Sequence, residues 1–153
     1  MELQDRLSAA LKAAMKAKEA ARLSTLRLVT AAIKDREIAR RSEGAAAGAL
    51  DDADLLAILA KMVKQRQESA RAYEAGGRAD LAAKELAEVA VIEEFLPRQM
   101  SGPEVEAAIV AAIAKLGAGS IRDMGRVMAE LKANHTGQMD FAAVGPMVKA
   151  RLG

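Results

Sequence analysis

Few side chains in this sequence belong to the types that carry out catalysis, and none stands at a catalytic spacing. The chain has one histidine, His135, and no cysteine, which excludes thiol nucleophiles, disulfides and thiolate metal sites. No Ser-His-acid set is apparent around His135, and neither a P-loop nor a dinucleotide-binding fingerprint occurs. We therefore predict no catalytic residue, no metal and no cofactor.

Three aspartates, Asp51, Asp52 and Asp54, stand close together and allow two interpretations. As metal ligands they would need a histidine or a second carboxylate cluster at a suitable spacing, and the sequence offers none. As the first residues of a helix they would accept hydrogen bonds from free backbone amides and meet the positive end of the helix dipole. The second interpretation is favoured.

Positive charge is the remaining chemical feature. The chain carries a net charge of +2, but residues 1–41 contain ten Lys and Arg against five Asp and Glu, whereas residues 77–100 contain three against five. Such asymmetry is typical either of solvated helix faces or of a surface that binds nucleic acid. The candidate phosphate-binding residues are Lys12, Lys16, Arg22, Arg27, Lys34, Arg40, Arg41, Arg122, Arg126, Lys132 and Lys149.

The elements that would position these residues are all helical. Apolar residues make up 52% of the chain and aromatic residues only 2%, a composition that favours helices over strands. Apolar residues recur at helical spacing, as in Leu3, Leu7 and Leu11 or in Leu26, Val29 and Ile33. The pattern predicts four helices over residues 2–18, 20–42, 51–75 and 78–95, followed by three shorter helices.

A boundary is expected where Leu96–Pro103 gathers two prolines and a glycine. We predict an N-terminal four-helix domain over residues 1–96, a proline-containing hinge, and a three-helix tail domain over residues 97–153. Ser101 with Glu104 matches a capping box at the start of the tail. Gly145-Pro146 interrupts the final apolar pattern, so the last regular helix is expected to begin only near Pro146.

No stretch of about 18 apolar residues occurs, and acids rather than bases follow Met1. The expected setting is the cytosol of a bacterium, with no membrane contact.

Several segments, in order along nearly the whole chain, resemble the bacterial YqeY family, also called GatB/YqeY domain proteins. They are Arg22-Leu23-Ser24-Thr25-Leu26-Arg27-Leu28, Val63-Lys64-Gln65-Arg66, Glu93-Glu94-Phe95-Leu96-Pro97, Asp123-Met124-Gly125-Arg126-Val127-Met128 and Val148-Lys149-Ala150-Arg151-Leu152. No single segment is diagnostic, but five in this order are specific.

The resemblance implies a four-helix part followed by a tail similar to the C-terminal domain of GatB, a component of the glutamine-dependent aspartyl/glutamyl-tRNA amidotransferase. It also implies carbon–nitrogen ligase activity with glutamine as amido donor, although this chain has no counterpart of the amidase Ser-Ser-Lys site. We therefore expect an accessory module that binds tRNA. The alternative is a protein-interaction module whose tail docks on a partner through Met124 and Met128.

Overall fold

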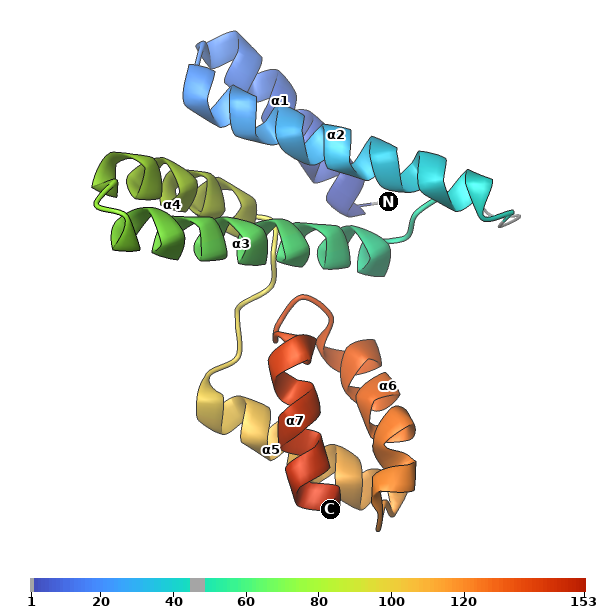
Figure 1. The fold of residues 1–153 in the computed structure, drawn as a ribbon. Helices are drawn as coiled ribbons and strands as arrows, with labels where there is room; N and C mark the ends of the chain where they lie inside the picture. Colours follow the sequence, from blue (N-terminus) through green and yellow to red (C-terminus); the bar gives the residue numbers. More distant parts are fainter. Residues whose placement is uncertain (1, 45–48) are drawn as a thin grey trace. The chain divides into compact units, whose positions relative to one another are not determined.

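The chain folds into α-helices joined by short turns, as the composition predicts (Figure 1). The structure, a computed structural model, describes residues 2–44 and 49–153, so part of the segment between the second and third predicted helices, residues 43–50, lies outside it. Within the described residues there are seven α-helices, one short 3₁₀-helix and no strand. None of these helices is both long and apolar enough to cross a bilayer. The chain divides into two compact units, Met1–Leu96 and Pro97–Gly153.

The first unit consists of two helical hairpins, and the most extensive contact is between the two helices of the second hairpin (Figure 1). Its helices are α1 (Glu2–Ala17), α2 (Ala20–Ser42), α3 (Asp52–Ala75) and α4 (Ala79–Glu93). These spans agree closely with those predicted from apolar spacing. Asp51 accepts a hydrogen bond from the amide of Asp54 at 2.8 Å, and the Asp54 carboxylate accepts one from the amide of Asp51 at 3.0 Å. Asp51 and Asp54 therefore form a capping box at the start of α3, as the helix-start interpretation predicts.

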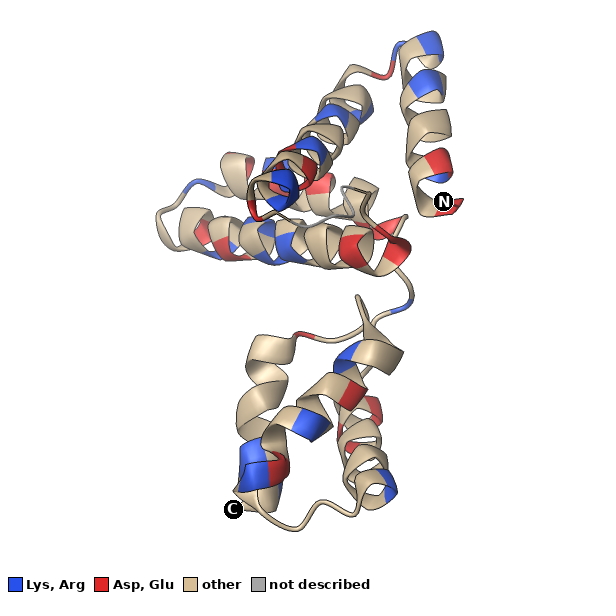
Figure 2. Ribbon diagram, turned by 90° about the vertical axis from the view of Figure 1, so that its right-hand side faces the viewer, with Lys and Arg blue, Asp and Glu red and all other residues tan. Residues whose placement is uncertain are grey.

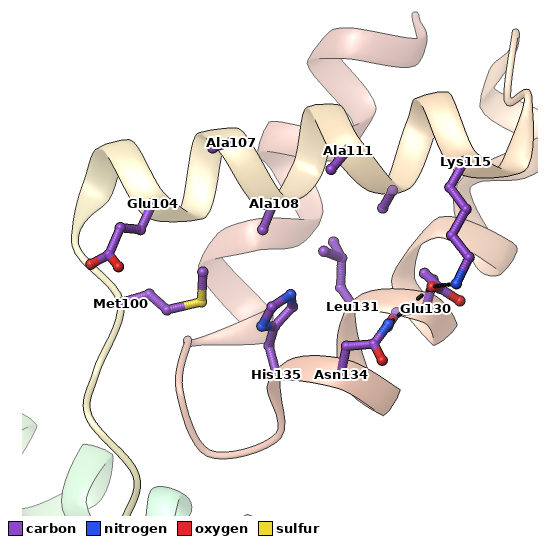
Figure 3. A pocket seen from close by; sticks show the side chains of 11 residues that line it. Met100, Glu104, Ala107, Ala108, Ala111, Lys115, Glu130, Leu131, Asn134 and His135 are labelled. Atoms are coloured by element: carbon purple, nitrogen blue, oxygen red, sulfur yellow. Dashed lines mark hydrogen bonds and ion pairs between the residues drawn. The ribbon is translucent and has the colours of Figure 1, made fainter.

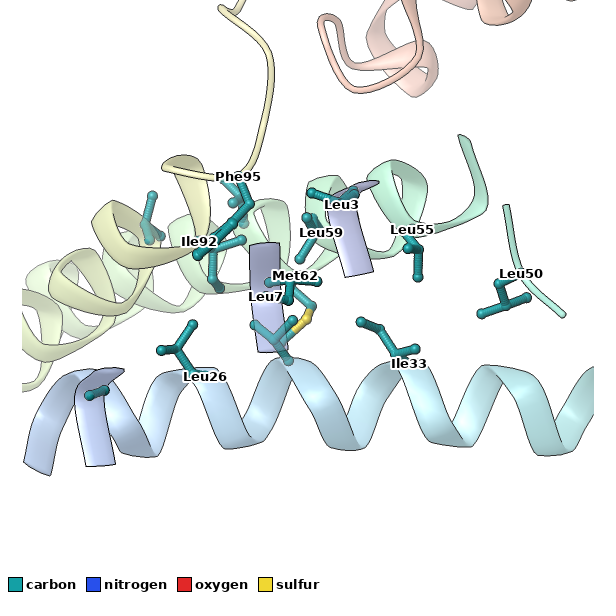
Figure 4. Packing of buried hydrophobic residues seen from close by; sticks show 14 residues of the cluster. Leu3, Leu7, Leu26, Ile33, Leu50, Leu55, Leu59, Met62, Ile92 and Phe95 are labelled. Carbon is teal, nitrogen blue, oxygen red and sulfur yellow. The ribbon is translucent and has the colours of Figure 1, made fainter. Parts of the chain in front are cut away.

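The core of the first unit is aliphatic, with one aromatic ring at its end (Figure 4). Leu26 and Val29 of α2, Leu55 and Leu59 of α3 and Ile92 of α4 are almost completely buried. Each lies on the apolar stripe of its helix, and packing of these stripes supplies most of the stability that helix propensity alone cannot. The stripe of α2 therefore fixes which of its side chains face solvent.

One charged pair lies inside this arrangement. Arg66 stands on the apolar stripe of α3, where the sequence requires it to find a carboxylate or reach the surface. It does the former: its Nε lies 3.1 Å from Oε2 of Glu88 on α4, and the two side chains are only 16% and 18% exposed. A second hydrogen bond of 3.2 Å runs from Arg66 Nη1 to the carbonyl oxygen of Met62.

The last residues of the first unit lie beyond the end of α4 and still belong to its core. Phe95 is only 6% exposed, and the guanidinium of Arg6 on α1 lies 5.6 Å from the centroid of its ring. Arg6 also donates a hydrogen bond of 3.1 Å to the carbonyl oxygen of Glu94. These contacts, together with the cation–π attraction, join the end of α4 to α1.

The second unit contains three α-helices around its own core. They are α5 (Gly102–Leu116), α6 (Met124–His135), which follows the 3₁₀-helix η1 (Ile121–Asp123), and α7 (Phe141–Leu152). The predicted capping box is present, because Ser101 accepts from the amide of Glu104 and Glu104 accepts from the amide of Ser101. Gly117 ends α5 in the left-handed conformation, at φ 62°, which a glycine adopts at little cost.

The predicted start of the last helix was wrong. We expected regular helix only from Pro146, whereas α7 begins at Phe141 and carries that proline inside it. Asp140 caps the helix by accepting a hydrogen bond of 3.0 Å from the amide of Ala142. Gly145 has no Cβ to clash with the proline ring, so the helical conformation before Pro146 is tolerated. The helix thus loses one backbone hydrogen bond without ending.

Candidate nucleic-acid interface

Helix α2 carries six of the chain's lysines and arginines and sorts them into two sets. Arg22, Arg36 and Arg40 form ion pairs. Arg22 Nη1 lies 2.5 Å from Glu94 at the end of α4, Arg36 lies 3.1 Å from Glu43, and Arg40 lies 2.7 Å from Asp54 in the capping box of α3. Their positive charge is therefore largely neutralised within the first unit.

The pKa shifts in this set agree with the geometry. The hydrogen bond to Glu94 raises the pKa of Arg22 above its already high ordinary value. The backbone amide of Asp51, followed by the guanidinium of Arg40, lowers the pKa of Asp54. Both changes favour the charged forms. Arg22 and Arg40, two of the predicted phosphate-binding residues, therefore act as interhelical ties.

The second set is Arg27, Lys34 and Arg41, which we call the basic row. All three side chains are exposed, and among the described residues no carboxylate lies within ion-pair distance of them. Because they are spaced by seven residues, they stay on one side of the helix with a drift of only about 20° per step. Successive members are separated by about 10.5 Å along the axis, since each residue rises about 1.5 Å.

Lys12 and Lys16 lie on α1, on the face opposite Leu3, Leu7 and Ala14, which are buried. Both lysines are exposed and, within the part of the chain that the structure describes, unpaired. They are separated by four residues and so share one face of the helix. They form a second, smaller cationic surface on the first unit.

The second unit holds the four remaining candidates. Arg126 is paired with Asp123 at 2.8 Å, whereas Arg122, Lys132 and Lys149 are exposed and have no ion-pair partner among the described residues. They belong to η1, α6 and α7 respectively, and these three elements contact one another. Ion pairs engage Glu104, Glu106 and Glu130 in the same unit, so the free charge that remains is mainly positive.

The predicted residues therefore do not form one continuous patch. Figure 2 shows Lys and Arg alternating with Asp and Glu along the helices of each unit. Three of the eleven candidates, Arg22, Arg40 and Arg126, are paired with carboxylates. For Arg22 and Arg40, helical spacing alone already indicates a position near the core. Arg22 stands seven residues before buried Val29 and Arg40 seven after buried Ile33, so both lie along the core-facing side of α2.

Sequence reasoning missed one feature, an open groove of about 610 Å³ between α5 and α6 (Figure 3). Its wall on α5 is made of alanines, among them Ala108 and Ala111, and Leu131 of α6 also lines it. Lys115 and Glu130 pair at 2.5 Å on its edge, and the amine of Lys115 lowers the pKa of Glu130. The run of alanines in α5 was the available signal, because their small side chains leave space between helices.

Met124 and Met128 do not form an exposed contact surface. Both are half-buried and pack against the core of the second unit. The methyl carbon of Met124 lies 3.8 Å from the position that a Cβ on Gly145 would take. Core packing thus accounts for the position of these methionines.

The surroundings of His135 are not those of a catalytic histidine. Its Nδ1 lies 3.4 Å from Oε1 of Gln138, so the polar neighbour of the imidazole is an amide and not a nucleophile. Across residues 2–44 and 49–153, no three His, Asp or Glu side chains gather where they could hold a metal ion.

Comparison with known proteins gives a family and a set of relatives. The family model described as Yqey-like protein matches residues 4–152. The chain is 31% identical over 96 residues to "Altered inheritance of mitochondria protein 41, mitochondrial" of Saccharomyces cerevisiae, covering 63% of this chain and 49% of that protein. Proteins of the same name also match from two other yeasts. The protein of Meyerozyma guilliermondii is 41% identical over 56% of this chain and 42% of the relative, and that of Kluyveromyces lactis is 34% identical over 69% of this chain and 56% of the relative.

The chain thus spans about half the length of the curated relatives it matches. These relatives are fungal proteins named as mitochondrial, so they lend no support to the expectation of a bacterial cytosolic protein.

Proposed function

Since the chain belongs to the Yqey-like protein family, we propose that it is an accessory protein that binds tRNA through cationic helix surfaces. The observation that carries the proposal is the basic row on α2, because its three side chains are exposed and, among the described residues, form no ion pair, while the neighbouring arginines are paired. A cation without an ion-pair partner can bind a phosphate without first breaking an ion pair. The counterions that the phosphate then releases are the main source of sequence-independent affinity for nucleic acids.

The tail supplies a second argument. Its resemblance to the C-terminal domain of GatB associates it with tRNA, and Arg122, Lys132 and Lys149 offer free positive charge there. The reaction of the amidotransferase is not part of the proposal, since the described side chains present no nucleophile–base pair around His135. The proposed role is binding.

The test is a fluorescence-anisotropy titration of unfractionated tRNA with the full chain at two salt concentrations. We expect binding that weakens steeply as salt rises, because log K falls by about 0.9 for each phosphate neutralised per decade of salt. A triple variant, Arg122→Gln, Lys132→Gln and Lys149→Gln, reports on the tail and should lower the salt slope. Absence of binding at the lower salt concentration would refute the proposal.

A second function, docking of a protein through residues 97–153, is favoured by one observation, the groove between α5 and α6. Its charged edge residues are already paired, Lys115 with Glu130 and Glu104 with Arg98 outside the groove, so it suits an apolar helix rather than a phosphate backbone. Cross-linking in cells with the full chain would test it, by comparing Ala111→Glu in the groove with Ala133→Glu on the exposed side of α6. A partner lost only with Ala111→Glu supports docking, and one retained by both variants contradicts it.

A further inference from the structure

We propose that the basic row binds the phosphate backbone of base-paired stems in preference to single strands. This inference rests on the proposed function and specifies the part of a nucleic acid that the first unit takes. Arg27, Lys34 and Arg41 are the side chains that make the contact.

The row is a rigid line of charges. Helix α2 is held along its inner side by buried Leu26, Val29 and Ile33. Ion pairs from Arg22 to Glu94 and from Arg40 to Asp54 fix it near both ends. A fixed row of cations about 21 Å long, two steps of about 10.5 Å, suits phosphates that are themselves held in fixed positions. A duplex provides these, whereas a flexible strand would have to be ordered at an entropic cost.

The surface around the row lacks the means by which proteins hold single strands. Such proteins stack unpaired bases on aromatic side chains. This chain has only three aromatic residues: Phe95 is 6% exposed, and Tyr73 and Phe141 are half-buried. None of them lies on α2, where the exposed neighbours of the row include Ala31 and Ile38.

Base-specific contacts are likewise not provided next to the row. The hydroxyl of Thr30 donates to the carbonyl oxygen of Leu26 at 3.0 Å, within the helix itself. Arg36, another long polar side chain of this region, is paired with Glu43. Asp35 and Glu37 also lie on this part of α2, and their carboxylates have the same sign of charge as a phosphate backbone. Contacts restricted to phosphates position a duplex without reading its sequence. The expected ligand is therefore a stem of any sequence.

The test compares an RNA hairpin stem with an unstructured RNA of equal length and charge, using the full chain in anisotropy titrations at several salt concentrations. The informative variant is the triple Arg27→Gln, Lys34→Gln and Arg41→Gln. The matched control is Lys61→Gln, Arg71→Gln and Lys84→Gln, which removes the same charge from exposed positions on α3 and α4. Circular dichroism checks that both variants remain folded.

We expect the hairpin to bind more tightly than the single strand. The row variant should weaken hairpin binding roughly fivefold to tenfold per charge removed near 0.1 M salt, and should lower the salt slope by about three. The control variant should change both by much less. Equal losses in the two variants, or tighter binding of the single strand, would overturn the inference while leaving RNA binding in place. Failure of the parent chain to bind any RNA would instead refute the proposed function.

Discussion

The Arg66–Glu88 pair offers a quantitative test of what holds α3 against α4. Replacing Arg66 with Met leaves the Glu88 carboxylate, 18% exposed in the paired state, without its partner, and replacing Glu88 with Met does the same to the guanidinium. Removing one partner of a fully buried pair costs about 3–5 kcal/mol. Since solvent still reaches about a sixth of each side chain here, we expect a loss of about 2 kcal/mol from either change.

The double variant separates pairing from packing. With both charges replaced by methionine no unpaired group remains, and the loss should not exceed about 1 kcal/mol, which gives a coupling of about 3 kcal/mol. Urea denaturation of the full chain followed by circular dichroism measures these differences. The single changes should also lower the melting temperature by roughly 8–16 °C if the first unit unfolds cooperatively.

The control is the exposed pair of Arg78 and Asp80, whose side chains are 59% and 67% exposed. The same substitution to Met at each of these positions should cost less than about 1 kcal/mol, because an exposed ion pair and a carboxylate in the first turn of α4 contribute little. If the changes at Arg66 and Glu88 were equally small, or simply additive in the double variant, the argument from burial would be wrong.

Three further predictions concern the second unit. Pro146→Ala restores an amide that can donate to the carbonyl of Ala142. Urea denaturation should therefore show that the free energy of unfolding rises by about 1–2 kcal/mol. A fall in that free energy would mean that the proline ring makes a contact that stabilises the fold more than the hydrogen bond does. Ser101→Ala removes a capping hydrogen bond and should cost about 1 kcal/mol, whereas Ser101→Gly should cost much less. The guanidinium of Arg98, with the capping amide, lowers the pKa of Glu104 from 4.5 to about 2, so the stability from that carboxylate is complete above about pH 4.5 and is lost as the pH falls toward 2. Arg98→Gln should raise that pKa and shift acid unfolding to higher pH, and a carboxyl NMR titration that still gave a value of about 2 would contradict it.

Local sequence patterns predicted most of the secondary structure. The recurrence of Leu3 and Leu7, and of Val29 and Ile33, indicated both the helices and their buried sides, and Asp51 and Ser101 indicated where α3 and α5 begin. The exception is α7, because Pro146 predicts a later start than the helix has. Asp140 caps the helix before the proline, and Gly145 removes the clash that would otherwise end it.

The site was less predictable, because pairing depends on tertiary neighbours. Arg22 and Arg27 both belong to the basic side chains of one helix, yet only Arg22 forms ion pairs. Its weaker partner, Glu19 at 3.8 Å, stands three residues before it, but the partner at 2.5 Å, Glu94, stands 72 residues away in the chain. Net charge in a window of sequence cannot distinguish the two. What distinguishes a paired from an unpaired arginine is the direction in which its side chain leaves the helix. That direction can be predicted only after the buried stripe of the helix has been assigned.

The contacts of Glu94 and Phe95 have a practical consequence for dividing the molecule. If only the helix boundaries were considered, a fragment containing the first unit would end at Glu93, the last residue of α4. Such a fragment would lack the ring on which Arg6 stacks and the carboxylate that neutralises Arg22. It should expose part of the aliphatic core to water and tend to self-associate, whereas a fragment ending at Leu96 keeps both.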